Sequence, residues 1–292
     1  MNQLSGAEAL VHMLRGHGVD YIFGLCGDTS LPFYDALHRL NHGITHILSR
    51  DERSAAYMAD GYARVSGKVG VCEGPSGGGA TYIAPGLVEA NESSIPILAI
   101  TTDISVGARG RYALTELDQS AMFRPLTKWN GVIERAEDIP KMLRAAFREM
   151  TTGRPGAAPL ALPFDVQKGA VDATDIWHDE DLGRHPAWPT GPDPAAITKL
   201  AAVLLAAKNP AIITEEAGRD PAGHAALVEL AELLAIPVVE GLFALYANFP
   251  TDHALYQGPG RPPLIDEADL ILTIGCRQPW YPLAKKPRKA RI

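Results

Sequence analysis

The chain has little cysteine. Its 292 residues contain only Cys26, Cys72 and Cys276, which stand far apart and never in the C-x-x-C spacing of a zinc site. Three scattered thiols also cannot form the disulfide framework of a small secreted protein, so this usage is typical of the reducing cytosol. We therefore predict a cytoplasmic protein without a metal site built from cysteines.

Positive charge and long apolar runs are scarce as well. Lys and Arg number 27 against 34 Asp and Glu, a net charge of −7, and no basic run occurs before the terminal segment KKPRKARI. This balance disfavours a nucleic-acid partner. The opening segment MNQLSGAEALVHMLRGHGVD is interrupted by charge and glycine, so we expect neither a signal peptide nor a membrane span there.

The sequence does contain an alternation of short apolar strands with amphipathic helices. The first helix begins at a capping box formed by Ser5 and Glu8. Strands this short and apolar, separated by helices, are typical of a parallel sheet that is covered on both faces. The expected strands are 21–25, 44–49, 69–72, 96–101 and 159–163, and the expected helices lie near 30–40, 53–65 and 137–150, with a fourth that ends near 91.

A second alternation follows a stretch without periodicity. Residues 169–192 are rich in Pro, Gly, Asp and His, and they are predicted to be a linker. Beyond them the apolar runs AIIT, IPVVE and ADLILTIG predict further strands, and the final ARI looks like the start of another. The sequence thus predicts an α/β protein of two successive doubly wound parallel-sheet domains, 1–168 and 193–292, with the second incomplete at its C-terminus.

Glu52 is the first candidate for a functional residue. It opens the helical stretch ERSAAYMADGYARVS directly after a strand, and the positions behind it are small residues such as Ala55, Ala56 and Ala59. A glutamate in a first helical turn can simply be solvated and complement the helix dipole. Ligands, however, bind at the carboxyl ends of strands in such sheets. A small-residue face would also let a flat ligand or a neighbouring subunit come close.

Two glycine-containing turns are weaker candidates. The stretch GPSGGGATYIAPGL at 74–87 can be a flexible turn, or it can direct backbone N–H groups toward a ligand at a helix N-terminus. Its spacing does not fit a Walker-type nucleotide site, since no lysine follows the glycines. In FGLCGDTSLPFYDAL at 23–37, Asp28 can be catalytic, but Asp28 or Thr29 can equally be a helix N-cap.

Five segments in order resemble a known family. They are GVDYIFGLCGD, DERSAAYMADGYAR, GPSGGGATYIAPGLVEANESSIPILAIT, FRPLTKWN and GRPGAAPLALPFDVQ. Together they look like the N-terminal half of a thiamine-diphosphate-dependent enzyme of the acetolactate synthase and 2-keto-acid decarboxylase superfamily. The resemblance covers residues 3 to about 168 closely and the remainder more loosely. It implies a pyrimidine-binding domain followed by a Rossmann-like central domain.

The resemblance also implies roles for individual residues. In this family the glutamate that matches Glu52 hydrogen-bonds the aminopyrimidine ring of thiamine diphosphate and promotes its active tautomer. A carboxyl group in a dry pocket suits this role, because burial lets it share a proton with a weakly basic ring nitrogen. Asp28 matches a second catalytic carboxylate of the decarboxylases, although their His-His dipeptide is absent. The implied cofactor-binding residues are Gly27, Ser76, Gly77, Gly79 and Thr81, and Thr115 and Glu116 match the substrate side.

Further expectations concern cofactors and partners. Family members hold the diphosphate through Mg²⁺ on a C-terminal domain with a G-D-G…N-N motif, and no G-D-G occurs here. No metal ligand is therefore assigned in this chain, which we expect to be inactive alone: one subunit of a split enzyme, a fragment, or a non-catalytic binding or regulatory relative. A homodimer or tetramer and a partner carrying the missing motif are implied. The resemblance also allows an FAD or ADP moiety in the central domain.

The leading functional hypothesis is that the chain forms part of a C–C bond lyase or carboligase that acts on 2-keto or 2-hydroxy acids. Acetolactate synthase-like carboligation comes first, because FRPLTKWN and GRPG resemble that group best. The substrate side departs from it, since Thr115 stands where a glutamine is usual. The segment YALTELDQ also resembles oxalyl-CoA decarboxylases. A 2-keto-acid decarboxylase or a 2-hydroxyacyl-CoA lyase is therefore the alternative.

Overall fold

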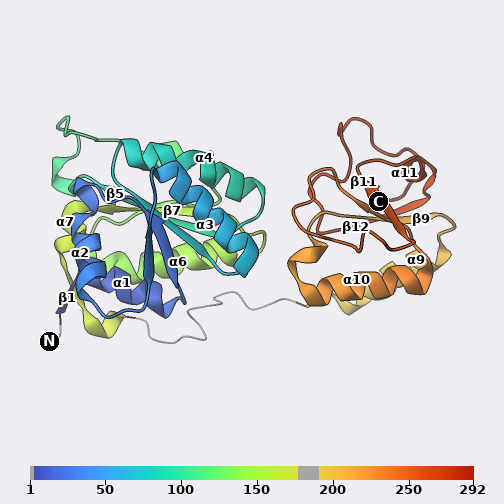
Figure 1. The fold of residues 1–292 in the computed structure, drawn as a ribbon, viewed down its shortest axis with the longest axis horizontal. Coiled ribbons are helices and arrows are strands. Elements are labelled where there is room, and N and C mark those ends of the chain that lie inside the picture. Colours follow the sequence, from blue (N-terminus) through green and yellow to red (C-terminus); the bar gives the residue numbers. More distant parts are fainter. Residues whose placement is uncertain (1–2, 177–190) are drawn as a thin grey trace. The chain divides into compact units, whose positions relative to one another are not determined.

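The computed structural model describes residues 3–176 and 191–292. These residues form two compact units, one within residues 3–176 and the other within residues 191–292 (Figure 1). Each unit has its own sheet and its own hydrophobic core, so each is described by itself. The predicted architecture of two successive parallel-sheet α/β domains is confirmed.

The first unit is built on a six-stranded sheet in which every neighbouring pair is parallel. The predicted strands of this sheet are all present, with ends shifted by a residue or two, and within this sheet the sequence pattern missed only the two-residue β6. In spatial order the strands are β3 (Thr45–Leu48), β2 (Tyr21–Gly24), β4 (Gly70–Gly74), β5 (Ile97–Asp103), β7 (Ala157–Pro163) and β6 (Gly131–Val132).

Helices cover both faces of this sheet (Figure 1). One hydrophobic core lies under α1 (Gly6–Gly16), α2 (Leu31–Arg39) and α6 (Ile139–Thr151), and a second lies under α3 (Glu52–Ser66) and α4 (Gly78–Glu92). Two short helices, α5 (Gln119–Phe123) and α7 (Phe164–Lys168), complete the unit. The predicted capping box is confirmed, since the Glu8 N–H donates to Ser5 Oγ at 3.2 Å and the Ser5 N–H donates to Glu8 Oε2 at 2.8 Å.

The beginning of the predicted linker belongs to the first unit instead. Residues Ala170–Asp172 form strand β8, which pairs antiparallel with β1 (Gln3–Ser5) at the start of the chain. Val171 and Ile176 are buried in the same core as α1, which fixes this segment onto the unit. The boundary proposed at residue 168 is therefore too early. The rest of the proposed linker, residues 177–190, lies outside the described residues.

The second unit has a four-stranded parallel sheet. Backbone hydrogen bonds join Arg291 to Asp269 and Ile271, so the final residues do begin to extend this sheet beside β12, as the sequence pattern predicts. In spatial order the strands are β11 (Tyr256–Pro259), β10 (Val238–Glu240), β9 (Pro210–Thr214) and β12 (Leu270–Ile274), with helices α9 (Pro194–Ala206), α10 (Pro221–Leu234) and α11 (Leu264–Glu267).

The small-residue face of α3 packs within the chain. Ala55, Ala56 and Ala59 are fully buried, and the helix contacts α4 and β4. A Cβ atom at Gly86 of α4 would stand 2.5 Å from the Cβ of Ala56, so the two helices approach as closely as glycine allows. The expectation that this face receives a ligand or a neighbouring subunit is therefore wrong. The alanines bring α3 close to its own sheet and to α4.

This packing predicts that alanine substitutions at two helical glycines have opposite effects on the stability of the chain. Gly86→Ala is expected to destabilise the chain by about 1–3 kcal/mol, because the added methyl group overpacks the contact with Ala56. Gly61→Ala in α3, where an added Cβ would meet nothing within 4 Å, is expected to stabilise the chain by about 0.5–1 kcal/mol. Urea denaturation of both variants measures the difference. Equal effects would contradict the close approach of α3 and α4.

Candidate functional site

The loops that follow β2, β4 and β5 meet at the carboxyl edge of the first sheet. The side chain of Thr29 joins them, since its Oγ1 accepts the Ser76 N–H at 3.0 Å and lies 2.8 Å from Thr102 Oγ1. A Cβ atom at Gly27 would stand 2.5 Å from the Cβ of Pro75, so these two loops touch. The sequence analysis treated Thr29 only as a possible cap and missed this connecting role.

Glu52 lies at this edge as the first residue of α3. Its side chain is 8% exposed, so it is not the solvated first-turn residue of the alternative interpretation. The helix cap is Asp51, whose Oδ1 accepts the Ser54 N–H at 2.8 Å, and Glu52 is therefore not needed for capping. A Cβ atom at Gly79 would stand 3.1 Å from Glu52 Oε1, and one at Gly74 would stand 3.3 Å from its Cγ.

The glycine-rich turn lies beside Thr115, so residues that were predicted to bind the cofactor contact one that was predicted on the substrate side. Gly77 has a φ of +67°, a conformation that favours glycine, and a Cβ atom there would stand 2.8 Å from Thr115 Cβ. The hydroxyl groups of buried Ser76 and of Thr115 lie 2.6 Å apart. The structure thus brings together residues from two distant segments. Thr81 behaves differently, since its hydroxyl donates to the Gly78 carbonyl within α4 at 2.7 Å.

Asp28 lies at the same edge but is exposed. It begins a short 3-10 turn, Asp28–Ser30, which leads into α2. The N-cap residue of the turn is Gly27, whose N–H donates to Ser30 Oγ at 2.9 Å, and the N-cap residue of α2 is Ser30. The alternative interpretation of Asp28 or Thr29 as a helix cap is therefore wrong. A catalytic role for Asp28 stays a prediction.

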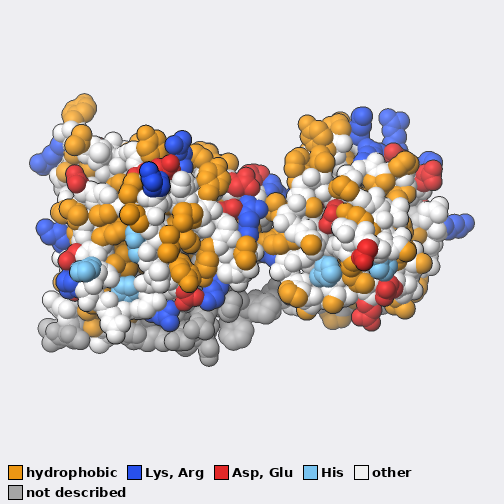
Figure 2. Space-filling model, viewed as in Figure 1, with side chains coloured by type: hydrophobic (Ala, Val, Ile, Leu, Met, Phe, Trp, Pro, Cys, Tyr) orange, Lys and Arg blue, Asp and Glu red, His pale blue; other side chains and the backbone are white. Residues whose placement is uncertain are grey.

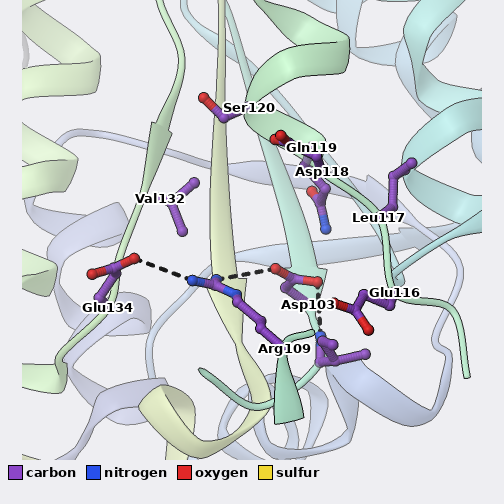
Figure 3. A pocket seen from close by; sticks show the side chains of 10 residues that line it. Asp103, Arg109, Glu116, Leu117, Asp118, Gln119, Ser120, Val132 and Glu134 are labelled. Carbon is purple, nitrogen blue, oxygen red and sulfur yellow. Dashed lines mark hydrogen bonds and ion pairs between the residues drawn. The ribbon is translucent and has the colours of Figure 1, made fainter. Parts of the chain in front are cut away.

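A pocket of about 310 Å³ opens beside Glu116 (Figure 3). Its centre is Arg109, which donates to Asp103 Oδ2 at 3.2 Å and to Glu134 Oε1 at 3.1 Å. Burial raises the pKa of Asp103, and the Arg109 guanidinium counteracts part of this rise. Glu116 itself accepts backbone N–H groups of Gly110 and Ala113, so it orders its own loop. The pocket therefore has one cation, already paired with two carboxylates.

Glu73 was missed by the sequence analysis. It lies in β4 with a fully buried side chain, and its Oε2 accepts the Tyr34 hydroxyl at 2.7 Å. His46 Nε2 lies 3.0 Å from the same hydroxyl. Burial raises the pKa of Glu73 to about 8, and the hydroxyls of Tyr34 and Ser30 oppose this rise. The available signal was a carboxylate directly after the apolar run VGVC, where the predicted strand ended two residues too early.

The second unit offers a test of the FAD or ADP expectation. Glu215 follows β9 and is buried, and its Oε2 accepts the backbone N–H groups of Arg277 at 2.7 Å and Gln278 at 3.1 Å. A Cβ atom at Gly241 would stand 2.3 Å from Glu215 Oε1, so the carboxylate fills this space. A diphosphate binds such backbone N–H groups itself and is repelled by a carboxylate. The residues at the end of β9 do not fit a dinucleotide diphosphate.

No group of three or more His, Cys, Asp and Glu side chains in the described parts of the chain is placed to hold a metal ion. In these same parts of the chain no helix combines the length and the apolar character that crossing a membrane requires.

Two family models match the chain. The family described as thiamine pyrophosphate enzyme, N-terminal TPP binding domain, matches residues 4–122, and the family described as thiamine pyrophosphate enzyme, central domain, matches residues 197–292. Thiamine pyrophosphate is the same compound as thiamine diphosphate. The chain therefore belongs to the thiamine pyrophosphate enzymes and carries their N-terminal and central domains.

Two of the relatives are acetolactate synthase large subunits. The chain is 38% identical over 283 residues to a probable acetolactate synthase large subunit of Methanocaldococcus jannaschii. This alignment covers 94% of this chain and 47% of the relative. It is 36% identical over 253 residues to the acetolactate synthase isozyme 3 large subunit of Escherichia coli, covering 87% and 44%. The chain spans about half the length of the curated relatives it matches.

Proposed function

We propose that the chain supplies the pyrimidine-binding side of an acetolactate synthase-like carboligase that joins 2-keto acids. The observation that carries the proposal is Glu52, a buried carboxylate held against Gly74 and Gly79 at the carboxyl edge of the sheet. The names of the relatives favour this reaction over the decarboxylase and acyl-CoA lyase alternatives. The usual glutamine is replaced by Thr115, so the acid that is accepted can differ from theirs.

The residues at this edge fit the pyrimidine part of thiamine diphosphate. Gly74 and Gly79 lie against the Glu52 side chain, where an added Cβ would stand 3.3 Å from Cγ and 3.1 Å from Oε1, so larger residues at these positions would crowd the carboxylate. Ser76 and Thr115 hold the turn beside it through their 2.6 Å hydroxyl contact. When bound, the cofactor would supply a thiazolium carbon acid, whose conjugate base is a nucleophile for keto groups. Glu52 would hold or release the proton at the pyrimidine ring, which is general acid–base work by a positioned carboxylate.

An activity assay tests this proposal. The chain is combined with a diphosphate-binding partner, thiamine diphosphate and Mg²⁺, and is supplied with pyruvate. The proposal predicts formation of a new C–C bond, detected as acetolactate. Release of carbon dioxide without a joined product would instead favour the decarboxylase alternative. No cofactor-dependent turnover with any 2-keto acid would favour a non-catalytic relative.

The metal-binding part of the site is proposed to lie on another domain or subunit. The described residues contain no cluster that could hold Mg²⁺, and the relatives are about twice as long as the chain. A partner with these ligands would anchor the diphosphate, while this chain would bind the pyrimidine ring.

This division of the site predicts weak cofactor binding by the chain alone. If the groups that anchor the diphosphate lie on the partner, this chain alone offers only the pyrimidine contacts, and we expect a dissociation constant above the micromolar range. Isothermal titration of the purified chain with thiamine diphosphate and Mg²⁺ measures it. Micromolar binding by the chain alone would contradict the divided site.

We also propose that the chain forms a homodimer or a larger even-numbered oligomer. Exposed hydrophobic side chains gather over α3 and α4, where Figure 2 shows them in orange. Tyr57 is 48% exposed, Val65 91% and Tyr82 52%. A second copy that covers this α3–α4 surface would place two Glu52 helices near a two-fold axis, an isologous interface. Its members are Tyr57, Met58 and Val65 on α3 with Tyr82 and Val88 on α4.

The double variant Tyr57→Glu with Tyr82→Glu is expected to be monomeric under conditions where the unmodified chain is a dimer. Two buried carboxylates would oppose an interface of more than about 1,000 Å². Sedimentation velocity measures the change. Tyr112→Glu is the control, because Tyr112 is 99% exposed and lies outside the α3–α4 surface. A monomeric unmodified chain would contradict the proposed oligomer.

A further inference from the structure

The carboxyl edge of the second sheet has the topology of a ligand site. Along the chain, β10 and β11 follow β9 on one side of it, and β12 then pairs with the other side of β9, so the strand order reverses there. In open parallel sheets, ligands bind in the crevice outside the carboxyl ends of the strands at such a reversal. The crevice of this unit therefore lies between the loop after β9 and the loop after β12.

The side chain of Glu215 crosses this crevice. Glu215 is the first residue after β9, and it is 3% exposed. Its Oε2 accepts the backbone N–H groups of Arg277 at 2.7 Å and Gln278 at 3.1 Å, both in the loop after β12. Its own N–H donates to the Gly275 carbonyl at 3.3 Å. Glu215 thus joins the two loops through its main chain and its side chain.

The N–H groups of Arg277 and Gln278 form an anion site. Successive backbone N–H groups that point to one place make a concave site for a phosphate or a carboxylate. Gly275 precedes them with a φ of +50°, a conformation that favours glycine. Hydrogen bonds from N–H groups to a charged oxygen are about twice as strong as those between neutral groups. A free anion must therefore displace the Glu215 carboxylate before it can bind there.

The loop after β10 covers the same carboxylate. A Cβ atom at Gly241 would stand 2.3 Å from Glu215 Oε1 and 2.4 Å from its Cγ, so this backbone lies directly against the side chain. The Glu215 carbonyl also accepts the Leu245 N–H at 3.3 Å. A diphosphate that entered the crevice would meet these filled contacts and would be repelled by the carboxylate.

We propose that Glu215 is a built-in anion that occupies the phosphate position at this crevice and closes the second unit to nucleotide diphosphates such as ADP and FAD. The carboxylate takes the hydrogen bonds from Arg277 and Gln278 that a phosphate oxygen would otherwise accept. The second unit then uses this crevice to join its own loops. The inference concerns this unit alone and does not depend on the role proposed for Glu52.

The first test is rescue of Glu215→Ala by acetate. This substitution removes the Cγ atom and the carboxylate, which together match one acetate ion. Acetate at several times its dissociation constant is expected to raise the melting temperature of Glu215→Ala by about 2–4 °C, because it occupies the vacated anion site. Sodium chloride at equal ionic strength is the salt control.

Glu215→Gln is the matched control variant, since its amide keeps the crevice filled and offers an oxygen to the same N–H groups. Acetate is expected to leave the melting temperatures of Glu215→Gln and of the unmodified chain unchanged relative to chloride. A rise of equal size in all three chains, or none in Glu215→Ala, would overturn the proposal.

The second test uses the unmodified chain and therefore holds even if Glu215→Ala does not fold. The chain is labelled with ¹⁵N, and NMR follows the amide signals of Arg277 and Gln278 during titration with ADP and with FAD. Neither signal is expected to move, because Glu215 retains both N–H groups. A saturable shift of both signals would show that a nucleotide displaces the carboxylate, and it would overturn the proposal.

Discussion

Replacing Glu52 by glutamine is expected to lower cofactor-dependent activity by about 100- to 10,000-fold, with the diphosphate-binding partner present. This is the range that a positioned acid–base group contributes. The amide keeps the size of the side chain and cannot hold or release the proton, and its neighbours Gly74 and Gly79 offer no replacement group. Steady-state kinetics over pH 6 to 9 measure the loss, which is expected in kcat and in kcat/KM.

Glu89→Gln is the matched control for this substitution. Glu89 is a glutamate of α4 whose Oε1 accepts from Arg64 at 3.0 Å, and its side chain is 49% exposed. Its amide variant is expected to keep full activity. A Glu52→Gln enzyme within about threefold of the unmodified one would correspond to less than about 1 kcal/mol of transition-state stabilisation, and it would contradict the assignment.

Replacing Glu73 by glutamine is expected to change how stability depends on pH. The folded chain keeps the Glu73 proton up to about pH 8, whereas the unfolded chain releases it near 4.5. The unmodified chain therefore loses stability as pH rises through this window, because the folded state binds more protons. Each pKa unit corresponds to about 1.4 kcal/mol, so the loss is of the order of a few kcal/mol. Glu73→Gln removes it.

Urea denaturation at pH 5 and pH 8 measures this effect. The two chains are expected to be similar in stability at pH 5, where glutamine resembles the neutral acid, and Glu73→Gln is expected to be the more stable at pH 8. Glu137→Gln serves as the control, because the Glu137 side chain is 63% exposed and pairs with Arg135 at the surface. An identical pH dependence with and without Glu73 would show that this carboxyl ionises normally.

Local sequence patterns were sufficient to predict most of the fold. Apolar strands between amphipathic helices predicted the parallel sheets, because strands buried on both faces leave a continuous apolar run. The same reasoning could not find β6, whose two residues carry no period, or β8, whose partner β1 lies at the other end of the unit. Pairing between distant segments is set by tertiary packing, so residues 170–176 were placed in a linker.

The candidate site was predictable where a motif was involved and not where contacts are long-range. Glu52 and the glycine-rich turn were found from their order along the chain. The contact of Ser76 with Thr115 joins residues 39 positions apart, and so does that of Tyr34 with Glu73. Neither contact has a local signature. The alanines of α3 were misinterpreted because small residues allow close approach without indicating which surface approaches.

The most direct test of the central claim is exchange of the C2 proton of thiamine diphosphate with solvent deuterium. Rapid-quench NMR follows this exchange with the chain, its diphosphate-binding partner and Mg²⁺ present. The role proposed for Glu52 predicts exchange much faster than in the free cofactor for the unmodified chain, and exchange at the free-cofactor rate for Glu52→Gln. If Glu52→Gln exchanges the proton as fast as the unmodified chain, Glu52 does not activate the cofactor.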